Sequence, residues 1–263
     1  MFHWIGAPKW ALAILAFTLA FSLLILSYLA FIRSREPLIT YVRTGGFAGI
    51  RDVLTIYQDG TAYLQSRTIG FLEIKLTEEE LKAVKLMLEE MRSLGSLSYG
   101  ARQGAADFFS HSIVSDGIEV SWVDQWAARE ELPLQLSASQ LLLDKLIQEA
   151  SGSVFAFKYG SFCGNLSIYV EASELILRKG EGIEIKVILE NLSKEGSKIP
   201  PPNFSGECLE IEATASKEIL GNGTLELTLR VVAECGGKIS KISISHEYGC
   251  EIEIPVFVLG SPD

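Results

Sequence analysis

The residue types with the most chemical potential are four cysteines, which all lie in the last part of the chain. They are Cys163, Cys208, Cys235 and Cys250, and the first 162 residues contain none. An even number of cysteines confined to one segment predicts two disulfides, which form in an oxidising compartment; four buried thiols are the alternative. No Cys-x-x-Cys pair is present, so a zinc ribbon is not expected. All pairings remain open, and one of them joins Cys235 to Cys250 and leaves Cys163 with Cys208.

The chain has only four asparagines, and each begins an Asn-x-Ser/Thr triplet, the acceptor pattern for N-glycosylation. The triplets start at Asn165, Asn191, Asn203 and Asn222, in the same region as the cysteines. Ser and Thr make up about one residue in seven, so four matches from four asparagines exceed chance by far. We therefore predict a glycoprotein whose C-terminal bulk lies outside the cytoplasm.

Histidines and carboxylates, the usual groups of acid–base and metal chemistry, are not arranged for catalysis. The three histidines are His3, His111 and His246, and the sequence has no His-Glu-x-x-His, Gly-x-Ser-x-Gly or phosphate-loop motif. His111 falls in a predicted strand and is expected to be structural. The run Glu78–Glu80 suits the first turn of a helix, where carboxylates favour the positive end of the helix dipole. We expect a protein that is not an enzyme, with no cofactor and no metal site.

A glycine-rich segment, Arg43–Ile50, is the place where a side chain could be presented to a partner. Gly45, Gly46 and Gly49 permit positive backbone φ angles after a strand, so Phe47 lies on a sharp connection. Phe47 either folds into the core or projects as the aromatic contact of a recognition loop.

This segment resembles the opening of emfourin, a small protein inhibitor of protealysin and related thermolysin-like metallopeptidases. The resemblance rests on Arg-x-Gly-Gly-Phe-Ala-Gly, matched from Arg43 to Gly49, and covers about residues 39–149. It continues through an Asp59-Gly60 turn, a Leu-rich helix, an Asp107-Phe108 strand start and the stretch Leu132–Leu136. The resemblance implies an α+β fold and a role in binding a peptidase.

If the resemblance extends to function, the domain would occlude the substrate cleft of a thermolysin-like metallopeptidase. Phe47 would fill an apolar pocket of the enzyme, and Arg43 would be a rim charge that affects the association rate. Trp126, in a predicted loop, is a further candidate contact, whereas Trp122 is expected in the core. The chain departs from the small, free-standing members of that family because it has an additional N-terminal segment and C-terminal domain.

The elements that position this segment are predicted to form an α+β domain over residues 38–150. Strands are expected at 38–43, 52–58, 61–67, 108–114 and 118–123, with Asp-Gly hairpin turns at 59–60 and 116–117. A capping box of Thr77 and Glu80 predicts a helix that runs to about Arg92. Ser137 and Gln140 predict the cap of a second helix.

A break at residues 151–153 precedes a strand-only region, 154–260. Apolar and polar residues alternate in three runs, at 183–190, 225–231 and 252–258, with glycine-rich turns between strands. This alternation predicts an antiparallel β-sandwich of Ig-like plan.

After a short tail of residues 1–9, residues 10–32 contain no charge and are long enough to cross a bilayer as a helix. We predict an uncleaved transmembrane signal anchor; a cleaved signal peptide and a pilin-like N-terminus are the alternatives. Basic residues flank both ends, so charge alone does not set the orientation. The disulfides and acceptor triplets favour a single-pass location in the cell membrane, with the C-terminal bulk extracytoplasmic.

The net charge of −10 argues against nucleic acid as a partner. Together these features predict a membrane-anchored binding protein, in concrete terms an inhibitor or modulator of a thermolysin-like metallopeptidase. The alternative is a structural or adhesive cell-envelope glycoprotein that acts through its β-sandwich. The predicted partner is accordingly a peptidase of this kind or a cell-envelope protein.

Overall fold

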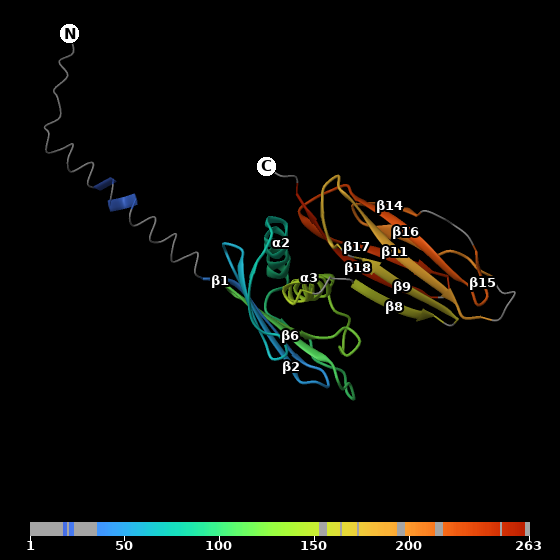
Figure 1. Ribbon diagram of the computed structural model, residues 1–263, viewed down its shortest axis with the longest axis horizontal. Coiled ribbons are helices and arrows are strands. Elements are labelled where there is room, and N and C mark those ends of the chain that lie inside the picture. Colours follow the sequence, from blue (N-terminus) through green and yellow to red (C-terminus); the bar gives the residue numbers. More distant parts are fainter. Residues whose placement is uncertain are drawn as a thin grey trace, which may run out of the picture.

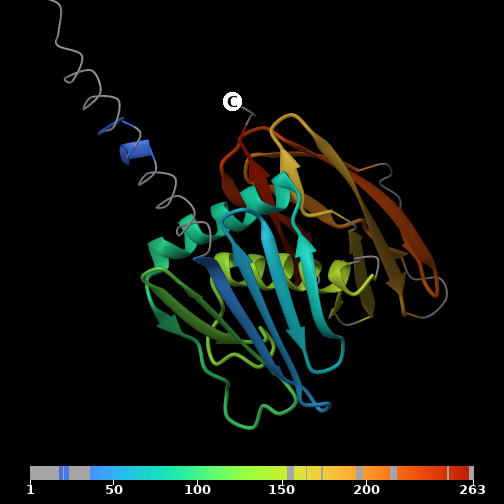
Figure 2. The same cartoon turned by 60° about the vertical axis from the view of Figure 1, so that its left-hand side comes forward.

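The computed structural model describes residues 18–19, 21–23, 36–152, 157–163, 165–172, 174–193, 198–213, 218–247 and 249–260, with 157–163 described as backbone. The N-terminal part is a seven-stranded sheet with two helices on one face (Figures 1 and 2). Its strands are β1 (Pro37–Gly45), β2 (Ile50–Tyr57), β3 (Thr61–Ser66), β4 (Gly70–Lys75), β5 (Leu97–Ser98), β6 (Phe109–Ser115) and β7 (Ile118–Val123), in the order β4-β3-β2-β1-β6-β7-β5. The helices are α2 (Glu78–Leu94) and α3 (Leu134–Ala150).

Local sequence signals explain where several of these elements begin and turn. Thr77 accepts a hydrogen bond from the Glu80 backbone N–H, and the Glu80 carboxylate accepts one from the Thr77 N–H, so the predicted capping box is confirmed. Gly60 and Gly117 have φ of +80° and +74°, as the predicted hairpin turns require. The predicted cap of the second helix is wrong: α3 begins one turn earlier, after Pro133, with no side-chain cap.

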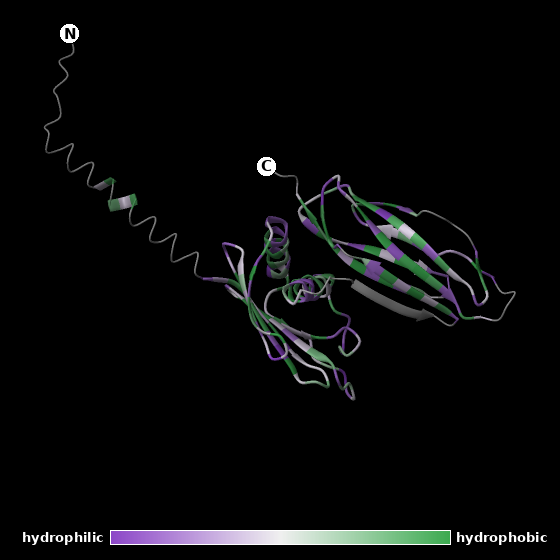
Figure 3. Cartoon of the chain, in the orientation of Figure 1, coloured by the Kyte–Doolittle hydropathy of each residue, from purple (hydrophilic) through white to green (hydrophobic). Residues whose placement is uncertain are grey.

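The C-terminal part is a sandwich of two main sheets. The four-stranded sheet has the order β10-β18-β17-β13, and the five-stranded sheet has the order β14-β16-β11-β9-β8. The strands are β8 (Phe157–Cys163), β9 (Leu166–Ala172), β10 (Ile176–Arg178), β11 (Gly182–Asn191), β13 (Asn203–Gly206), β14 (Leu209–Ala213), β16 (Thr224–Ala233), β17 (Lys238–His246) and β18 (Cys250–Leu259), and β12 (Lys198–Ile199) pairs with β15 (Ile219–Leu220). Hydrophobic and polar residues alternate along β11 and β16, as Figure 3 shows. Buried hydrophobic side chains fill the space between the sheets.

The helices join the two parts through a continuous core. Side chains of β17 and β18, among them Ile239, Phe257 and Leu259, are buried in the same cluster as the apolar faces of α2 and α3. An ion pair between Arg178 of β10 and Glu79 of α2 lies at this junction. The helices are therefore enclosed between the seven-stranded sheet and the four-stranded sheet, with the five-stranded sheet outermost (Figure 1).

One finding corrects both the fold class and the single-pass membrane location predicted from the sequence. Within the residues that the structure describes, no helix is long and apolar enough to cross a membrane. These residues are mostly β-strand, in several sheets, and not a transmembrane helix followed by an α+β domain and a separate sandwich. Most of the predicted anchor, residues 10–32, lies outside the described residues.

Candidate functional site

The hairpin between β1 and β2 carries the most exposed large hydrophobic side chain among the described residues. Gly45, Gly46 and Gly49 have φ of +128°, +67° and +57°, and the Gly49 N–H donates to the Gly46 carbonyl at 3.0 Å. Phe47 lies at this tip and is 96% exposed, so its ring does not fold into the core. The tip projects at the end of the sheet, at the bottom of Figure 2.

Close packing against β6 holds the backbone of the tip in place. The Gly46 N–H donates to the Phe108 carbonyl at 3.1 Å, which continues the pairing of β1 with β6. A Cβ on Gly46 would lie 2.9 Å from the Phe109 ring. The glycine thus permits close approach as well as the turn, and the tip rests on an aromatic ring.

Arg43 lies beneath the tip in a largely buried ion-pair cluster. Its guanidinium donates to Asp52 Oδ2 at 2.6 and 3.1 Å and to Asp144 Oδ1 at 2.7 Å, and its Cζ lies 5.5 Å from the Phe109 ring centroid. Burial lowers the pKa of Arg43, but the charges of Asp144 and Asp52 outweigh it and raise that pKa. Because the guanidinium is bound on both sides within the fold, Arg43 holds β1 to β2 and α3. Arg43 is therefore not the exposed rim charge predicted from the sequence, because its guanidinium is paired within the fold.

The two carboxylates of this cluster have unequal environments. Burial raises the pKa of Asp144 despite the opposing charge of Arg43. Asp52 is 1% exposed, and no described residue hydrogen-bonds its Oδ1. Neither carboxylate was predicted from the sequence as a site residue. Asp52 lies on the same face of β2 as the buried Leu54 and Ile56, and this alternation is the signal that indicates a buried carboxylate.

A second buried network ties β1, β6 and β7 together beside the cluster. The Tyr41 hydroxyl lies 2.7 Å from His111 Nδ1, and His111 Nε2 lies 3.1 Å from Asp124 Oδ1. Gln140 of α3 donates to Asp124 Oδ1 at 3.4 Å and accepts from Trp122 Nε1 at 3.2 Å. His111 is 2% exposed with both ring nitrogens engaged, so it serves as a structural link, and Trp122 lies in the core as predicted.

The electrostatics of this network favour an ionised Asp124. Burial raises the pKa of Asp124, but hydrogen bonds from His111, from the Phe109 backbone N–H and from Gln140 outweigh it and lower that pKa. The Phe109 N–H donates to Asp124 Oδ2 at 2.8 Å, which fixes the loop after β7 against β6. This loop carries Trp126, which is 52% exposed. The fold therefore brings Phe47 and Trp126 to the same end of the seven-stranded sheet, on a buried polar support.

One of the four predicted glycosylation positions does not fit the folded structure. Asn191 is 1% exposed, and its Nδ2, the atom that a glycan would occupy, donates to the Ile219 carbonyl at 3.0 Å. Its Oδ1 accepts bonds from the Ser193 N–H and hydroxyl, so this triplet forms a turn. Asn165, Asn203 and Asn222 are exposed, so glycans there remain predictions.

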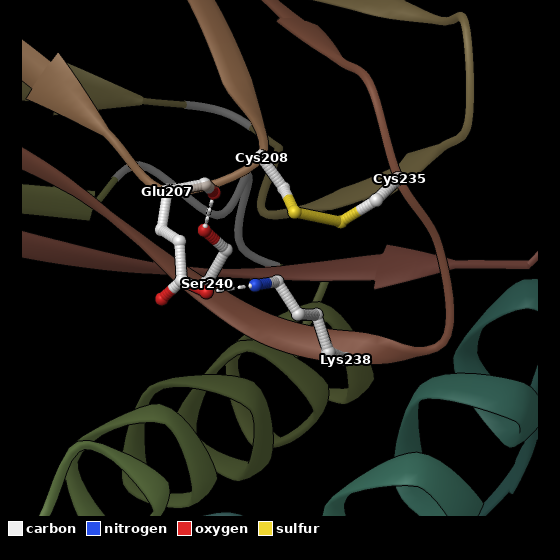
Figure 4. Close-up of a disulfide and its surroundings, with 5 residues drawn as sticks. All are labelled: Glu207, Cys208, Cys235, Lys238 and Ser240. Atoms are coloured by element: carbon white, nitrogen blue, oxygen red, sulfur yellow. Dashed lines mark hydrogen bonds and ion pairs between the residues drawn. A yellow bond between two sulfur atoms is a disulfide. The ribbon is translucent and has the colours of Figure 1, made fainter.

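The structure contains one of the predicted disulfides in described residues, between Cys208 and Cys235 (Figure 4). It joins the turn before β14 to the turn before β17, with a Cα–Cα distance of 5.4 Å. This pairing corrects the one suggested from the sequence, in which Cys235 would bond to Cys250; Cys250 is buried in the sandwich and is also disulfide-bonded. Beside the bridge, Lys238 pairs with Glu207 at 2.6 Å, and the Ser240 hydroxyl donates to the Glu207 carbonyl.

Comparisons with known proteins place the chain in no family. No family model matches the sequence, and no curated protein matches it. Among solved structures, domains 4 and 5 of the S-layer protein SbsC are similar with a TM-score of 0.28 and 13% identity, over 58% of this chain and 65% of that one. SbsC domains 1–6 and domains 4–9 each give a TM-score of 0.29 and 13% identity over 87% of this chain, which spans only 28% and 31% of their lengths. At TM-scores this low, neither fold nor function is transferred from these proteins.

Proposed function

We propose that this chain is a non-catalytic binding protein with a structural or adhesive role in the cell envelope. In this proposal the hairpin tip Gly45–Gly49 presents Phe47 to a protein partner. The observation that carries the proposal is the 96% exposure of Phe47 on a backbone held by β6. A large aromatic side chain on a preorganised backbone loses little conformational entropy when it enters a pocket, which is typical of interface hot spots.

The buried networks beneath the tip support the same role. Arg43, Asp52 and Asp144 connect both strands of the hairpin to α3, and Asp124 fixes the loop that carries Trp126. Two exposed aromatic residues thus lie at one end of the sheet, away from the sandwich, as Figure 1 shows for the hairpin strands. The continuous core through α2 and α3 supports a role as a rigid spacer, in which the sandwich contributes contacts of its own.

Site-specific photo-crosslinking tests this proposal in the full chain. A photoreactive phenylalanine analogue replaces Phe47 in one protein and Val114 in a control; Val114 is 48% exposed on the face of the sheet without helices. In the native host, position 47 should crosslink to one discrete protein, either a second copy of this chain or another envelope component. Position 114 should give no such product. A crosslinking pattern that is the same at both positions would contradict the proposal.

A second candidate function, inhibition of a thermolysin-like metallopeptidase, is favoured by the shape of the same tip. A narrow hairpin with one fully projecting ring could enter a substrate cleft and exclude substrate. The test measures peptidase activity with the full chain and with Phe47→Ala. An inhibitor should act competitively and lose roughly 30-fold or more in affinity in the variant. If the intact chain does not inhibit the peptidase, this second function is excluded and the structural or adhesive role is retained.

A further inference from the structure

The face of the seven-stranded sheet opposite the helices contains a shallow hollow that the proposed function does not use. It has a volume of about 250 Å³ and is lined by side chains from three neighbouring strands, namely Val53, Thr55, Tyr57, Tyr63, Gln65 and Phe71. Figure 2 shows α2 and α3 on the other face of these strands. The hollow is therefore separated from the core of the protein by the sheet itself.

Three aromatic rings define the shape of the hollow. The Tyr63 and Phe71 rings are nearly parallel, at 21° with centroids 5.6 Å apart, and Tyr57 meets Tyr63 edge-on at 83° and 5.8 Å. Phe71 is 68% exposed, although it belongs to a regular strand. Aromatic residues so exposed are uncommon on the surface of a monomer and mark binding sites when they cluster. The arrangement provides two ring surfaces with a third ring beside them.

The strand register places polar groups next to these rings. Tyr63 lies opposite Thr55 of β2 and Glu73 of β4, and Gln65 lies opposite Phe71. A hydroxyl and an amide thus line the hollow, where they can both donate and accept hydrogen bonds. The lining has no charged side chain. Strand alternation places charges of both signs around it on the same face, namely Glu73, Lys75, Arg51 and Arg67, all exposed.

We infer that this hollow binds a neutral carbohydrate, with a sugar ring stacked on the aromatic side chains. The C–H face of a pyranose ring is apolar and packs on an aromatic face, while its edge carries hydroxyls that pair with groups such as those of Thr55 and Gln65. An anionic sugar is not favoured, because the lining holds no cationic side chain to pair with its charge. The rings alone would also attract a cation, but Thr55 and Gln65 add neutral hydrogen-bonding groups that match the hydroxyls of a sugar. The volume is below the roughly 300–1,000 Å³ of sites for drug-sized ligands, so it suits one or two sugar rings of a longer glycan.

Affinity electrophoresis of the full chain tests this inference. Native gels contain a neutral polysaccharide, namely laminarin, mannan or xylan, or the anionic polysaccharide alginate as a control. At least one neutral polysaccharide should retard the protein, whereas alginate should not. Phe71→Ala should weaken retardation roughly fivefold or more, because the ring platform is removed, and Phe71→Tyr should retain it.

Two further variants make the outcome specific. Val114→Ala lies on the same face outside the hollow and should bind as the parent does. Phe47→Ala should also bind normally, which separates this inference from the proposed function of the hairpin tip. No retardation by any of the neutral polysaccharides would overturn the inference. Equal losses in Phe71→Ala and Val114→Ala would do so too.

Discussion

The requirement for glycine at the hairpin tip can be tested with a matched pair, Gly45→Ala and Gly49→Ala. Both variants add one methyl group to a glycine of positive φ in the same turn. At Gly49, with φ of +57°, the new Cβ would lie 3.4 Å from the flexible end of Arg67. At Gly45, with φ of +128°, it would lie 2.3 Å from the main-chain oxygen of Phe108. The two positions therefore differ in backbone strain and in the space available.

These geometries predict different losses in the free energy of unfolding for the two variants. An L-residue in the left-handed region costs about 1–2 kcal/mol, which is the full expected effect of Gly49→Ala. At Gly45 the backbone strain is about 1–3 kcal/mol. The carbonyl of Phe108 must also move, which weakens the 3.1 Å bond from the Gly46 N–H and costs about 1 kcal/mol more. We expect Gly45→Ala to reduce the free energy of unfolding by about 2–4 kcal/mol.

Calorimetry of the two full-length variants measures this difference. At about 2–4 °C per kcal/mol, Gly45→Ala should lower Tm by roughly 5–15 °C and Gly49→Ala by about half as much or less. Amide hydrogen exchange at Gly46 should accelerate only in Gly45→Ala, because the new Cβ in that variant displaces the Phe108 carbonyl to which the Gly46 N–H donates. Equal Tm values for the two variants, with unchanged exchange at Gly46, would refute the idea that packing against β6 fixes the tip.

Three other substitutions and one measurement on the native protein have definite expected outcomes. Phe47→Ala should change the free energy of unfolding by less than about 0.5 kcal/mol, measured by urea denaturation, because the ring is 96% exposed. Replacing Cys208 and Cys235 together by serine should cost about 3–4 kcal/mol in the same measurement, since the bridge closes a loop with a sequence separation of 27. The folded-state pKa of Asp124 is lowered, so its carboxylate stabilises the fold above its unfolded pKa of about 3.9. Asp124→Asn should therefore reduce the free energy of unfolding by about 1–3 kcal/mol at pH 7. This difference should shrink as the pH falls through the lowered pKa. Glycopeptide mass spectrometry of protein from its native host should find Asn191 unmodified, and a glycan there in the folded protein would contradict its burial.

Much of the secondary structure could be predicted because its signals are local. Alternating residues predicted three strands of the sandwich, β11, β16 and β18. Asp-Gly pairs predicted two hairpins, and Thr77 with Glu80 predicted the start of α2. Strand β4 escaped prediction because Gly70–Lys75 has exposed or half-buried side chains on both faces at the edge of the sheet. The start of α3 was also missed, since it has no side-chain cap.

The sequence by itself predicted the turn at Gly45–Gly49, because glycine permits the positive φ that a sharp turn needs. Only the tertiary structure decided that Phe47 projects and that Arg43 is buried between Asp52 and Asp144. It also decided that the Asn191 side chain is buried and hydrogen-bonded to the Ile219 carbonyl. The same holds for the disulfide, since the spacing of four cysteines is compatible with every pairing. These features depend on residues up to 101 positions apart, as Arg43 and Asp144 are. Local propensities act over a few residues and set each element, whereas packing of the whole chain decides which polar groups meet and which remain exposed.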